Sequence, residues 1–405
     1  MTSPAEPPTY FRKGFGLKSA VQDELAADYD GQVVDYLRSH DYTLVTGDVT
    51  IRLAREFGFC YGVERAVEYA YQTRRKFPDR RIFLVGEIIH NPHVNDRLRT
   101  MGIDILAHPD PTGAFDFSSI APDDVVIMPA FGVTIDDFSA LRTLGCILVD
   151  TTCGSVLNVW KRVESYARDG FTALIHGKYY HEETRATASQ VRKYPDGHYL
   201  IVRNMDEAMV VCGYIEGRVS AAELMEQFAK AVSPGFDPDQ HLARIGVANQ
   251  TTMLARESLA IGEAVGESIA RVRGEDYRAE SFRSFDTICS ATQERQDAVR
   301  ELLDTGVDVM VVIGGFNSSN TISLAALCAD SVSTFHIETS SAIDPAARSI
   351  HFRPAVIKHS ERDVVDWLPQ GPVRVGLTAG ASTPNNKIGD VVTRVLATRG
   401  LKAEL

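Results

Sequence analysis

The stretch Cys146-Ile-Leu-Val-Asp-Thr-Thr-Cys153 runs from an apolar segment through a short polar loop to a cysteine. After this cysteine, apolar side chains recur at helical spacing, at Val156, Val159, Trp160 and Val163. Short aliphatic runs are typical of buried parallel strands, and an amphipathic helix is the usual connection that follows one. The stretch therefore predicts a strand, a loop and a helix of one α/β unit, with Cys153 where the helix begins.

The same frame occurs a second time in the chain. Phe285-Asp-Thr-Ile-Cys289 repeats the pattern Asp-Thr-x-Cys, again before a helical pattern. A third cysteine, in Phe57-Gly-Phe-Cys60, opens the first strong helical pattern of the sequence. Three thiols at equivalent places in separate segments predict three arms that converge on one soft metal centre.

Apolar runs typical of strands alternate with helical patterns along most of the chain. These runs are Arg81–Val85, Val125–Met128, Cys146–Val149, Thr172–Ile175, Arg244–Val247, Val309–Ile313 and Val373–Leu377. The alternation indicates an α/β fold with mostly parallel strands. We expect three α/β units, at residues 49–149, 150–285 with an insertion near 214–240, and 286–405. Residues 1–48 are polar and irregular, and are expected to form an N-terminal extension outside the main core.

Composition limits the class of protein. The 405 residues carry a formal net charge of −12, which argues against a general nucleic-acid binder. No apolar run is long enough to cross a membrane, and we expect no secretory signal because the N-terminus has no apolar segment. The six cysteines lack the regular short spacing of a disulfide framework, so the expected compartment is a reducing cytoplasm.

The three repeated cysteines have the properties of metal ligands. A thiol at the beginning of a helix favours the thiolate form, and thiolates select zinc or iron–sulfur clusters. Structural zinc usually draws on paired Cys-x-x-Cys spacing, which is absent here, so a cubane cluster with one iron free of protein ligands fits better. The other three cysteines, Cys146, Cys212 and Cys328, fall inside regular elements and are expected in the core.

Polar side chains follow several predicted strands, where ligands bind in open α/β sheets. His90 and His181 follow strands closely and are expected in a binding site, with Glu183 beside His181 as a proton donor. Ser318-Ser319-Asn320, after a glycine pair, and Ser382 offer the hydroxyl and amide groups typical of phosphate binding. No Walker A or Rossmann glycine pattern follows a strand, so no nucleotide cofactor is indicated.

Together these residues resemble the 4-hydroxy-3-methylbut-2-enyl diphosphate reductase family, from about Ile51 to Pro384. The motifs that carry the resemblance are Phe59-Cys60-x-Gly62-Val63, Glu87-Ile-Ile-His90-Asn91, Asp150-Thr-Thr-Cys153, His181-Glu-Glu183, Gln250-Thr251-Thr252, Asp286-Thr-Ile-Cys289, Asn317-Ser-Ser-Asn320 and Thr378-Ala-Gly-Ala-Ser382. One position departs from the pattern, because Phe131 stands where many members have a histidine. This variant resembles the branch of the family associated with oxygenic phototrophs.

The resemblance implies three α/β units with mostly parallel sheets, in pseudo-threefold arrangement around one central [4Fe–4S] iron–sulfur cluster. It implies that Cys60, Cys153 and Cys289 hold the cluster and leave one iron open. The residues that it implies for binding the substrate's diphosphate are His90, His181, Ser318, Ser319, Asn320 and Ser382. Glu183 is implied as the catalytic proton donor, assisted by Thr251, which is also implied in substrate binding.

The implied reaction is reductive dehydroxylation of 4-hydroxy-3-methylbut-2-enyl diphosphate to isopentenyl and dimethylallyl diphosphate, the last step of the non-mevalonate isoprenoid pathway. Reduced ferredoxin or flavodoxin is the implied electron donor. No nucleic-acid or membrane partner is expected, and the sequence does not indicate an oligomeric state. Three alternatives stay open: a non-redox dehydratase or condensing enzyme of the quinolinate synthase type, a zinc or thiol–disulfide protein, and an iron–sulfur redox sensor.

Overall fold

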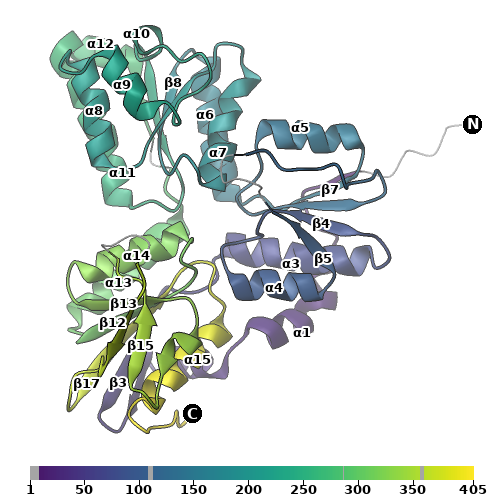
Figure 1. Ribbon diagram of the computed structural model, residues 1–405, viewed down its shortest axis with the longest axis vertical. Helices are drawn as coiled ribbons and strands as arrows, with labels where there is room; N and C mark the ends of the chain where they lie inside the picture. Colours follow the sequence, from purple (N-terminus) through teal and green to yellow (C-terminus); the bar gives the residue numbers. More distant parts are fainter. Residues whose placement is uncertain (1–8, 108–112, 286, 356–359) are drawn as a thin grey trace, which may run out of the picture. The chain divides into compact units, whose positions relative to one another are not determined.

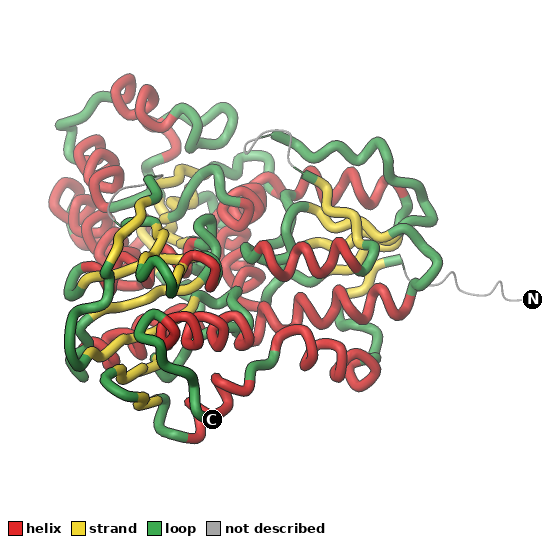
Figure 2. The backbone as a smooth tube through the Cα atoms, turned by 60° about the horizontal axis from the view of Figure 1, so that its bottom comes forward, coloured by secondary structure: helices red, strands yellow, loops and turns green. Residues whose placement is uncertain are grey.

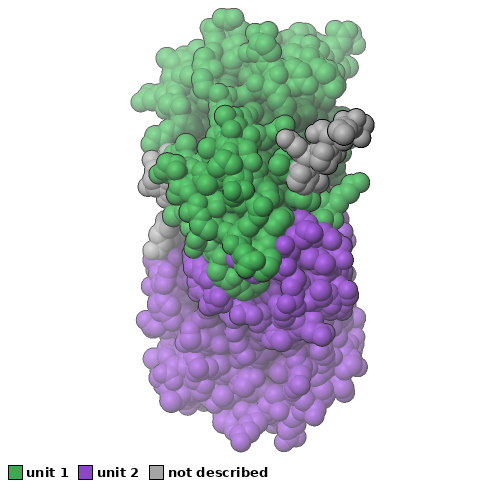
Figure 3. Space-filling model, turned by 90° about the vertical axis from the view of Figure 1, so that its right-hand side faces the viewer, with its two compact units in different colours: residues 1–14, 77–88, 101–289 green, residues 15–76, 89–100, 290–405 purple. Residues whose placement is uncertain are grey.

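The computed structural model describes residues 9–107, 113–285, 287–355 and 360–405. The contacts within the chain divide it into two compact units, which Figure 3 shows in different colours. Unit 1 comprises Met1–Gly14, Phe77–Ile88 and Met101–Cys289, and unit 2 comprises Phe15–Lys76, Ile89–Thr100 and Ser290–Leu405. Each unit is therefore assembled from segments that lie far apart in the sequence.

In the described part of unit 1, the first sheet has the strand order β1-β7-β6-β4-β5, and all neighbours are parallel. Its strands are β1 (Tyr10–Phe11), β4 (Ile82–Val85), β5 (Ile103–Leu106), β6 (Val125–Met128) and β7 (Ile147–Asp150). β4 and β6 bury all their side chains, as interior strands of a parallel sheet do. Helix α5 (Ile135–Leu144) begins where the Thr134 hydroxyl accepts the Asp137 N–H, and α6 (Gly154–Arg168) begins after Cys153.

The second sheet of unit 1 is also parallel, with the order β11-β10-β8-β9. Its strands are β8 (Thr172–His176), β9 (Tyr199–Val202), β10 (Ile245–Asn249) and β11 (Phe282–Ser284). The helical elements around it are α7 (Glu182–Ser189), η1 (Gln190–Lys193), α8 (Met205–Ile215), α9 (Ala221–Phe228), α10 (Pro238–His241), α11 (Ala255–Arg273) and α12 (Glu275–Ser281). Figure 1 shows α8 and α11 running along this part of the unit, where they enclose one continuous apolar core.

The five-stranded sheet of unit 2 has the order β13-β12-β17-β3-β2, in which only the β2–β3 pair is antiparallel. Its strands are β2 (Thr43–Thr46), β3 (Val49–Leu53), β12 (Val309–Ile313), β13 (Ser333–Ile337) and β17 (Val373–Ala379). The helices of this unit are α1 (Lys18–Tyr29), α2 (Gln32–Ser39), α3 (Tyr61–Lys76), α4 (Pro92–Thr100), α13 (Ser290–Asp304), α14 (Ser319–Ala329) and α15 (Asn385–Ala397). A small antiparallel sheet with the order β14-β15-β16 completes it, from β14 (Ile343–Asp344), β15 (Ser349–Phe352) and β16 (Arg362–Val365), preceded by η2 (Ser340–Ala342).

The architecture confirms the predicted α/β class with mostly parallel sheets, and Figure 2 shows strands and helices interleaved along the backbone. The boundaries predicted at 48, 149 and 285 stay predictions. Strand pairing nevertheless places β3, which begins where the first α/β unit was expected to begin, beside β17 of the C-terminal part. The stretch near 214–240 contains the short helices α9 and α10. Among the described residues, no helix combines the length and the apolar character needed to cross a membrane.

Residues 9–48 do not form the extension outside the core that their polar composition predicted. β1 pairs with β7, and β2 pairs with β3. Val34 and Leu37 on α2 have no exposed surface, and they belong to the same apolar cluster as the strands of the unit 2 sheet. The few apolar residues of this segment recur on one helical face, which a low average hydropathy conceals.

Replacing Leu37 by alanine is expected to lower the free energy of unfolding by about 2 to 5 kcal/mol, because it leaves a cavity in this core. Chemical denaturation of the whole protein measures the change. Val45→Ala is the control, because Val45 is 66% exposed on the neighbouring strand and its truncation is expected to cost less than about 1 kcal/mol. Equal losses in the two variants would mean that α2 is not part of the core.

Candidate active site

One backbone hydrogen bond fixes the position of each repeated cysteine. The Cys153 N–H, just after β7, donates to the carbonyl of Ala130 at 2.9 Å, just after the neighbouring strand β6. In the same way the Cys60 N–H donates to Ala381 at 3.3 Å, beyond β17, and the Cys289 N–H to Thr251 at 3.4 Å, beyond β10. Each cysteine therefore stands just beyond the carboxyl end of a pair of parallel strands.

In unit 1, Cys153 and Cys289 lie in one small environment. Cys153 precedes the first turn of α6, and the hydroxyl of Ser155 lies 3.3 Å from the sulfur of Cys289. Burial raises the pKa of the Cys153 thiol, the nearby Cys289 adds to this rise, and the N–H groups of Ser155 and Val156 oppose it. A bound cation would oppose this effect of burial, since a nearby positive charge favours the thiolate form of both cysteines. Asp286, which completes the second Asp-Thr-x-Cys frame, lies outside the described residues.

The loop that carries Cys153 is held by a buried carboxylate. Oδ1 of Asp150 accepts the Thr152 N–H at 2.9 Å and the Thr152 hydroxyl at 2.5 Å. Oδ2 of Asp150 accepts the Tyr10 hydroxyl at 2.6 Å, so the N-terminal strand β1 contributes to this loop. The Thr151 hydroxyl donates to the carbonyl of Met128. Asp150 thus closes a turn in front of Cys153 through Thr152, the variable third position of the frame, while the shared threonine, Thr151, joins the loop to the end of β6.

Glu183 and Thr251, both predicted for catalysis, are in direct contact in unit 1. The Glu183 side chain is 1% exposed, and its Oε1 accepts the Thr251 backbone N–H at 2.6 Å. The Glu183 N–H in turn donates to Nδ1 of His181 at 3.2 Å, and His181 caps the N-terminus of α7. Because Nδ1 of His181 acts as an acceptor, the neutral ring carries its proton on Nε2. The N–H group of the neutral imidazole, which can donate a hydrogen bond, is therefore at Nε2.

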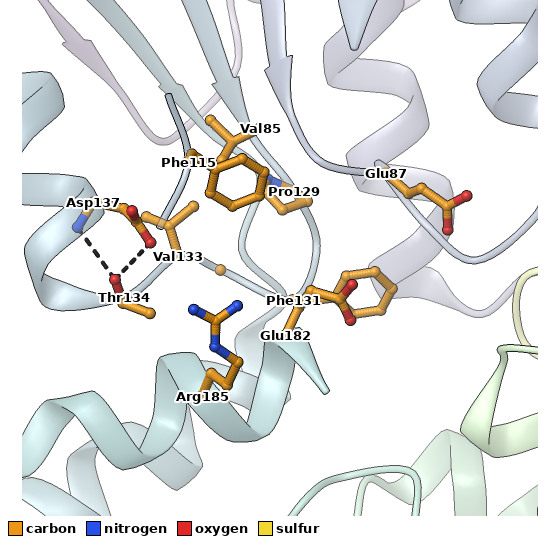
Figure 4. A pocket seen from close by; sticks show the side chains of 11 residues that line it. Val85, Glu87, Phe115, Pro129, Phe131, Val133, Thr134, Asp137, Glu182 and Arg185 are labelled. Atoms are coloured by element: carbon orange, nitrogen blue, oxygen red, sulfur yellow. Dashed lines mark hydrogen bonds between the residues drawn. The ribbon is translucent and has the colours of Figure 1, made fainter. Parts of the chain in front are cut away.

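Phe131 packs against the same histidine. The two ring centroids are 5.7 Å apart with an interplanar angle of 81°, an edge-to-face contact. Figure 4 shows Phe131 and Glu182 on one side of a small cavity of about 20 Å³ and Arg185 nearby. Arg185 donates to the carbonyl of Gly113 at 2.8 Å. The phenyl ring of Phe131 contributes shape and an apolar contact, and its side chain has no group that can donate a hydrogen bond.

Unit 2 brings together the other residues predicted for diphosphate binding, namely His90, Ser318, Ser319, Asn320 and Ser382, all of which are buried. The Ser382 hydroxyl donates to the carbonyl of His90 at 3.2 Å. Ser318 is the N-cap of the eleven-residue helix α14, so the backbone N–H groups of its first turn favour an anion. Oδ1 of Asn320 accepts the Ala381 N–H at 2.9 Å, while its Nδ2 is a buried donor with no partner among the described residues.

Two amides that the sequence analysis did not assign also belong to these loops. Nδ2 of Asn317 lies 3.4 Å from Nδ1 of His90. Oε1 of Gln250 accepts the Lys178 N–H at 3.2 Å and the Thr184 hydroxyl at 3.0 Å, which joins the loops after β8 and β10. Both residues lie within quoted motifs, at strand ends, and an amide at such a position was the available signal.

The comparisons with known proteins agree with this geometry. The family model described as LytB protein matches residues 51–396. The 4-hydroxy-3-methylbut-2-enyl diphosphate reductase of Thermosynechococcus vestitus is 46% identical over 397 residues, which cover 97% of this chain and 95% of that protein. The corresponding reductase of Gloeobacter violaceus is 46% identical over 396 residues, with 97% and 93% covered.

Two solved structures resemble the chain. A structure of (E)-4-hydroxy-3-methyl-but-2-enyl diphosphate reductase, described as the terminal enzyme of the non-mevalonate pathway, superposes with a TM-score of 0.51 and 27% identity, covering 85% of this chain and 98% of that one. The E-1-hydroxy-2-methyl-but-2-enyl-4-diphosphate reductase from Plasmodium falciparum superposes with a TM-score of 0.61 over 88% of this chain and 90% of that one. At 20% identity, the second likeness concerns the fold alone.

The six cysteines are expected to react unequally in the native, metal-free protein. Cys146, Cys212 and Cys328 are buried, and burial raises the pKa of Cys146 to about 11 and of Cys328 to about 12. Because the thiolate reacts with iodoacetamide, these three thiols should stay unlabelled at pH 8 while the partly exposed Cys60, Cys153 and Cys289 are labelled, with Cys153 slowed because burial raises its pKa as well. Peptide mass spectrometry reads the sites, and the same protein in denaturant, where all six react, is the control. Labelling of Cys328 as fast as Cys60 would contradict the expectation.

Proposed function

Because the chain belongs to the LytB protein family, we propose that it reduces 4-hydroxy-3-methylbut-2-enyl diphosphate to isopentenyl and dimethylallyl diphosphate, the last step of the non-mevalonate pathway. The reaction consumes two electrons and two protons, and the substrate's hydroxyl leaves as water. The observation that carries the proposal is the buried pair of Glu183 and Thr251, in which the Thr251 carbonyl also accepts the N–H of Cys289.

One [4Fe–4S] cluster per chain, held by Cys60, Cys153 and Cys289 with one iron open, is the cofactor of this proposal. The donor set fits an iron–sulfur cluster, because all three thiols are partly exposed in otherwise buried strand-end loops. The hydroxyl of Ser155 near the sulfur of Cys289 is a group that can donate to a cluster thiolate. When bound, the cluster supplies single electrons and a Lewis-acidic iron for the substrate's hydroxyl.

The diphosphate is held by donors that the two units provide separately. His181 offers its Nε2–H, because its Nδ1 is already engaged as an acceptor. In unit 2 the donors are His90, Ser318, Ser319, Asn320 and Ser382. The unpartnered Nδ2 of Asn320 supports this role most directly, since a buried amide donor without a partner is costly and a phosphate oxygen would satisfy it. Holding the charged end fixes the allylic end for reaction.

The Glu183 carboxyl delivers the proton to the departing hydroxyl. Its Oε1 accepts the Thr251 N–H at 2.6 Å, which orients the carboxyl group. The nearly complete burial of this side chain keeps bulk water from competing with the transfer. Thr251 also places its side chain at the same strand end and is proposed to contact the substrate. Reduced ferredoxin or flavodoxin is the proposed source of the electrons, because each carries single electrons of low potential.

Anaerobic purification followed by iron and sulfide counts and reduced-dye turnover tests the function. The expected result is about four iron and four sulfide per chain and dye oxidation that depends on 4-hydroxy-3-methylbut-2-enyl diphosphate. A cluster without turnover would instead favour a non-redox enzyme of the quinolinate synthase type, whose substrate carries no diphosphate. If the purified protein contained no iron, both the proposed cluster and the proposed reaction would be contradicted.

Glu183→Gln is expected to retain the cluster and substrate binding but to lower kcat by about 10²- to 10⁴-fold, because the amide cannot deliver the proton. Dye-linked turnover measures kcat, and iron content measures the cluster. Glu207→Gln is the matched control, since Glu207 is also a buried glutamate of unit 1 but lies on α8 and pairs with Arg203. Unchanged turnover in Glu183→Gln would show that Glu183 is not the proton donor.

Replacement of Cys60, Cys153 or Cys289 by serine, one at a time, is expected to abolish stable cluster binding, because serine is a poor ligand for iron in sulfide clusters. Iron and sulfide counts with visible absorption spectra measure the loss. Cys212→Ser is the control, because Cys212 is buried in α8 away from the strand-end loops and should keep a full complement. A full iron count in any one of the three variants would exclude that cysteine as a ligand.

A further inference from the structure

Arg295 carries a buried charge that has no acidic partner in the part of the chain that the structure describes. It lies on α13, whose first residue Ser290 directly follows Cys289, and it is 3% exposed. No carboxylate oxygen of the described residues lies within 4.0 Å of its guanidinium nitrogens. Most arginines of the protein that form ion pairs are far more exposed, as Arg300 in the same helix is at 39%. A buried guanidinium without a counter-charge is unfavourable and requires an explanation.

The contacts of Arg295 are with backbone carbonyls. Nη2 donates to the carbonyl of Gly58 at 2.7 Å and, at 3.5 Å, to that of Phe57. Nη1 donates to the carbonyl of Ala291 at 2.8 Å, in the first turn of α13. Nε is buried and has no partner among the described residues. The side chain therefore joins the loop before Cys60 to the helix that begins after Cys289, and its acceptors among the described residues are neutral carbonyls.

The loop that Arg295 holds has little freedom to move. Gly58 has a φ of +68°, and a Cβ there would lie 3.1 Å from the carbonyl oxygen of Thr383. The Gly58 N–H donates to Ala379 and the Cys60 N–H to Ala381, each at 3.3 Å. Each bond continues the pairing of β3 with β17. With the guanidinium on the opposite, carbonyl side, both hydrogen-bonding faces of the loop are engaged, and the backbone at Cys60 is fixed.

We propose that Arg295 is a positioning residue for the iron–sulfur cluster, and that its charge is balanced by the cluster thiolates rather than by a carboxylate. This inference rests on the proposed function, since it requires a cluster on Cys60. Three thiolates leave such a cluster negatively charged, and reduction adds a further negative charge. A fixed buried cation beside one ligand loop stabilises the reduced state more than the oxidised state. Arg295 thus adjusts the reduction potential as well as the position of Cys60.

The charge and the geometry of Arg295 can be separated by substitution. Arg295→Gln and Arg295→Met remove the charge, whereas Arg295→Lys keeps it but loses the planar fork that reaches two segments at once. Removal of the charge is expected to lower the ratio of reduced to oxidised cluster about tenfold at a fixed ambient potential. For a one-electron couple this equals a shift of the midpoint potential by about 59 mV to more negative values.

Anaerobic redox titration of the cluster-loaded protein, followed by electron paramagnetic resonance, measures this shift. Arg295→Lys should keep a midpoint potential close to that of the unsubstituted protein but release iron faster to a chelator. Arg399→Gln is the matched control, because Arg399 also donates to backbone carbonyls, at Pro369 and Gly371, but pairs with Asp48. Loaded Gln and Met variants with an unchanged potential would overturn the inference.

Thermal unfolding keeps the inference testable if the uncharged variants lose the cluster. In the metal-free protein Arg295 has no acidic partner among the described residues, so Arg295→Met should cost there only its hydrogen bonds to backbone carbonyls. In the loaded protein it should cost much more, so the rise in Tm on cluster binding should shrink. Equal losses of Tm with and without the cluster would identify a purely structural role and overturn the inference. Absence of iron from the unsubstituted protein would instead contradict the proposed function, which keeps the two failures distinct.

Discussion

The site depends on a backbone hydrogen bond that crosses between two adjacent strand-end loops. In each of the three sheet ends, the N–H of a cysteine donates to a carbonyl that lies just beyond the neighbouring strand. A side chain that made this contact would lose rotamer freedom on forming it. The two backbones lose no further conformational freedom once the strands are paired. The position of each sulfur is therefore set by strand register, and an error of one residue in register would move it out of the site.

This dependence explains why small and hydroxylated residues follow the strands. Ala130 and Ala381 accept the hydrogen bonds of Cys153 and Cys60 through their backbone carbonyls. Thr152 uses its hydroxyl within its own turn, on Asp150. The polar groups that remain for a ligand, such as Nδ2 of Asn320, are then few and directed. A crowded and mostly satisfied site needs little reorganisation when an anion binds.

The sequence predicted the parts of this design that are local. Each pattern that it used extends over about ten residues or fewer, namely the apolar runs, the helical spacing and the Asp-Thr-x-Cys frame. The observed strands and the positions of the cysteines agree with these patterns. The contribution of Leu37 to the core was not predictable from average composition, because burial of a sparse amphipathic face depends on which sheet it meets. The pairing of β3 with β17 joins residues more than three hundred positions apart, and no local pattern specifies it. The same limit applies to Arg295, which looks like any helical arginine until Gly58 is placed beside it.

Phe131 shows how a site tolerates the loss of a polar contact. A histidine at this position would offer a donor to the diphosphate, whereas the phenyl ring lies edge-to-face against His181. Since the Glu183 N–H already fixes Nδ1 of His181, the ring contact restrains the same imidazole from a second direction. The chain thus lacks the donor of a second histidine but orients the imidazole of His181 more firmly. The cost of a missing hydrogen bond to a charged group is about 1.5 to 3 kcal/mol, so orientation offsets only part of it. If the proposed diphosphate role of Asn320 holds, the binding contribution of its buried amide should therefore be larger in this chain than where both histidines are present.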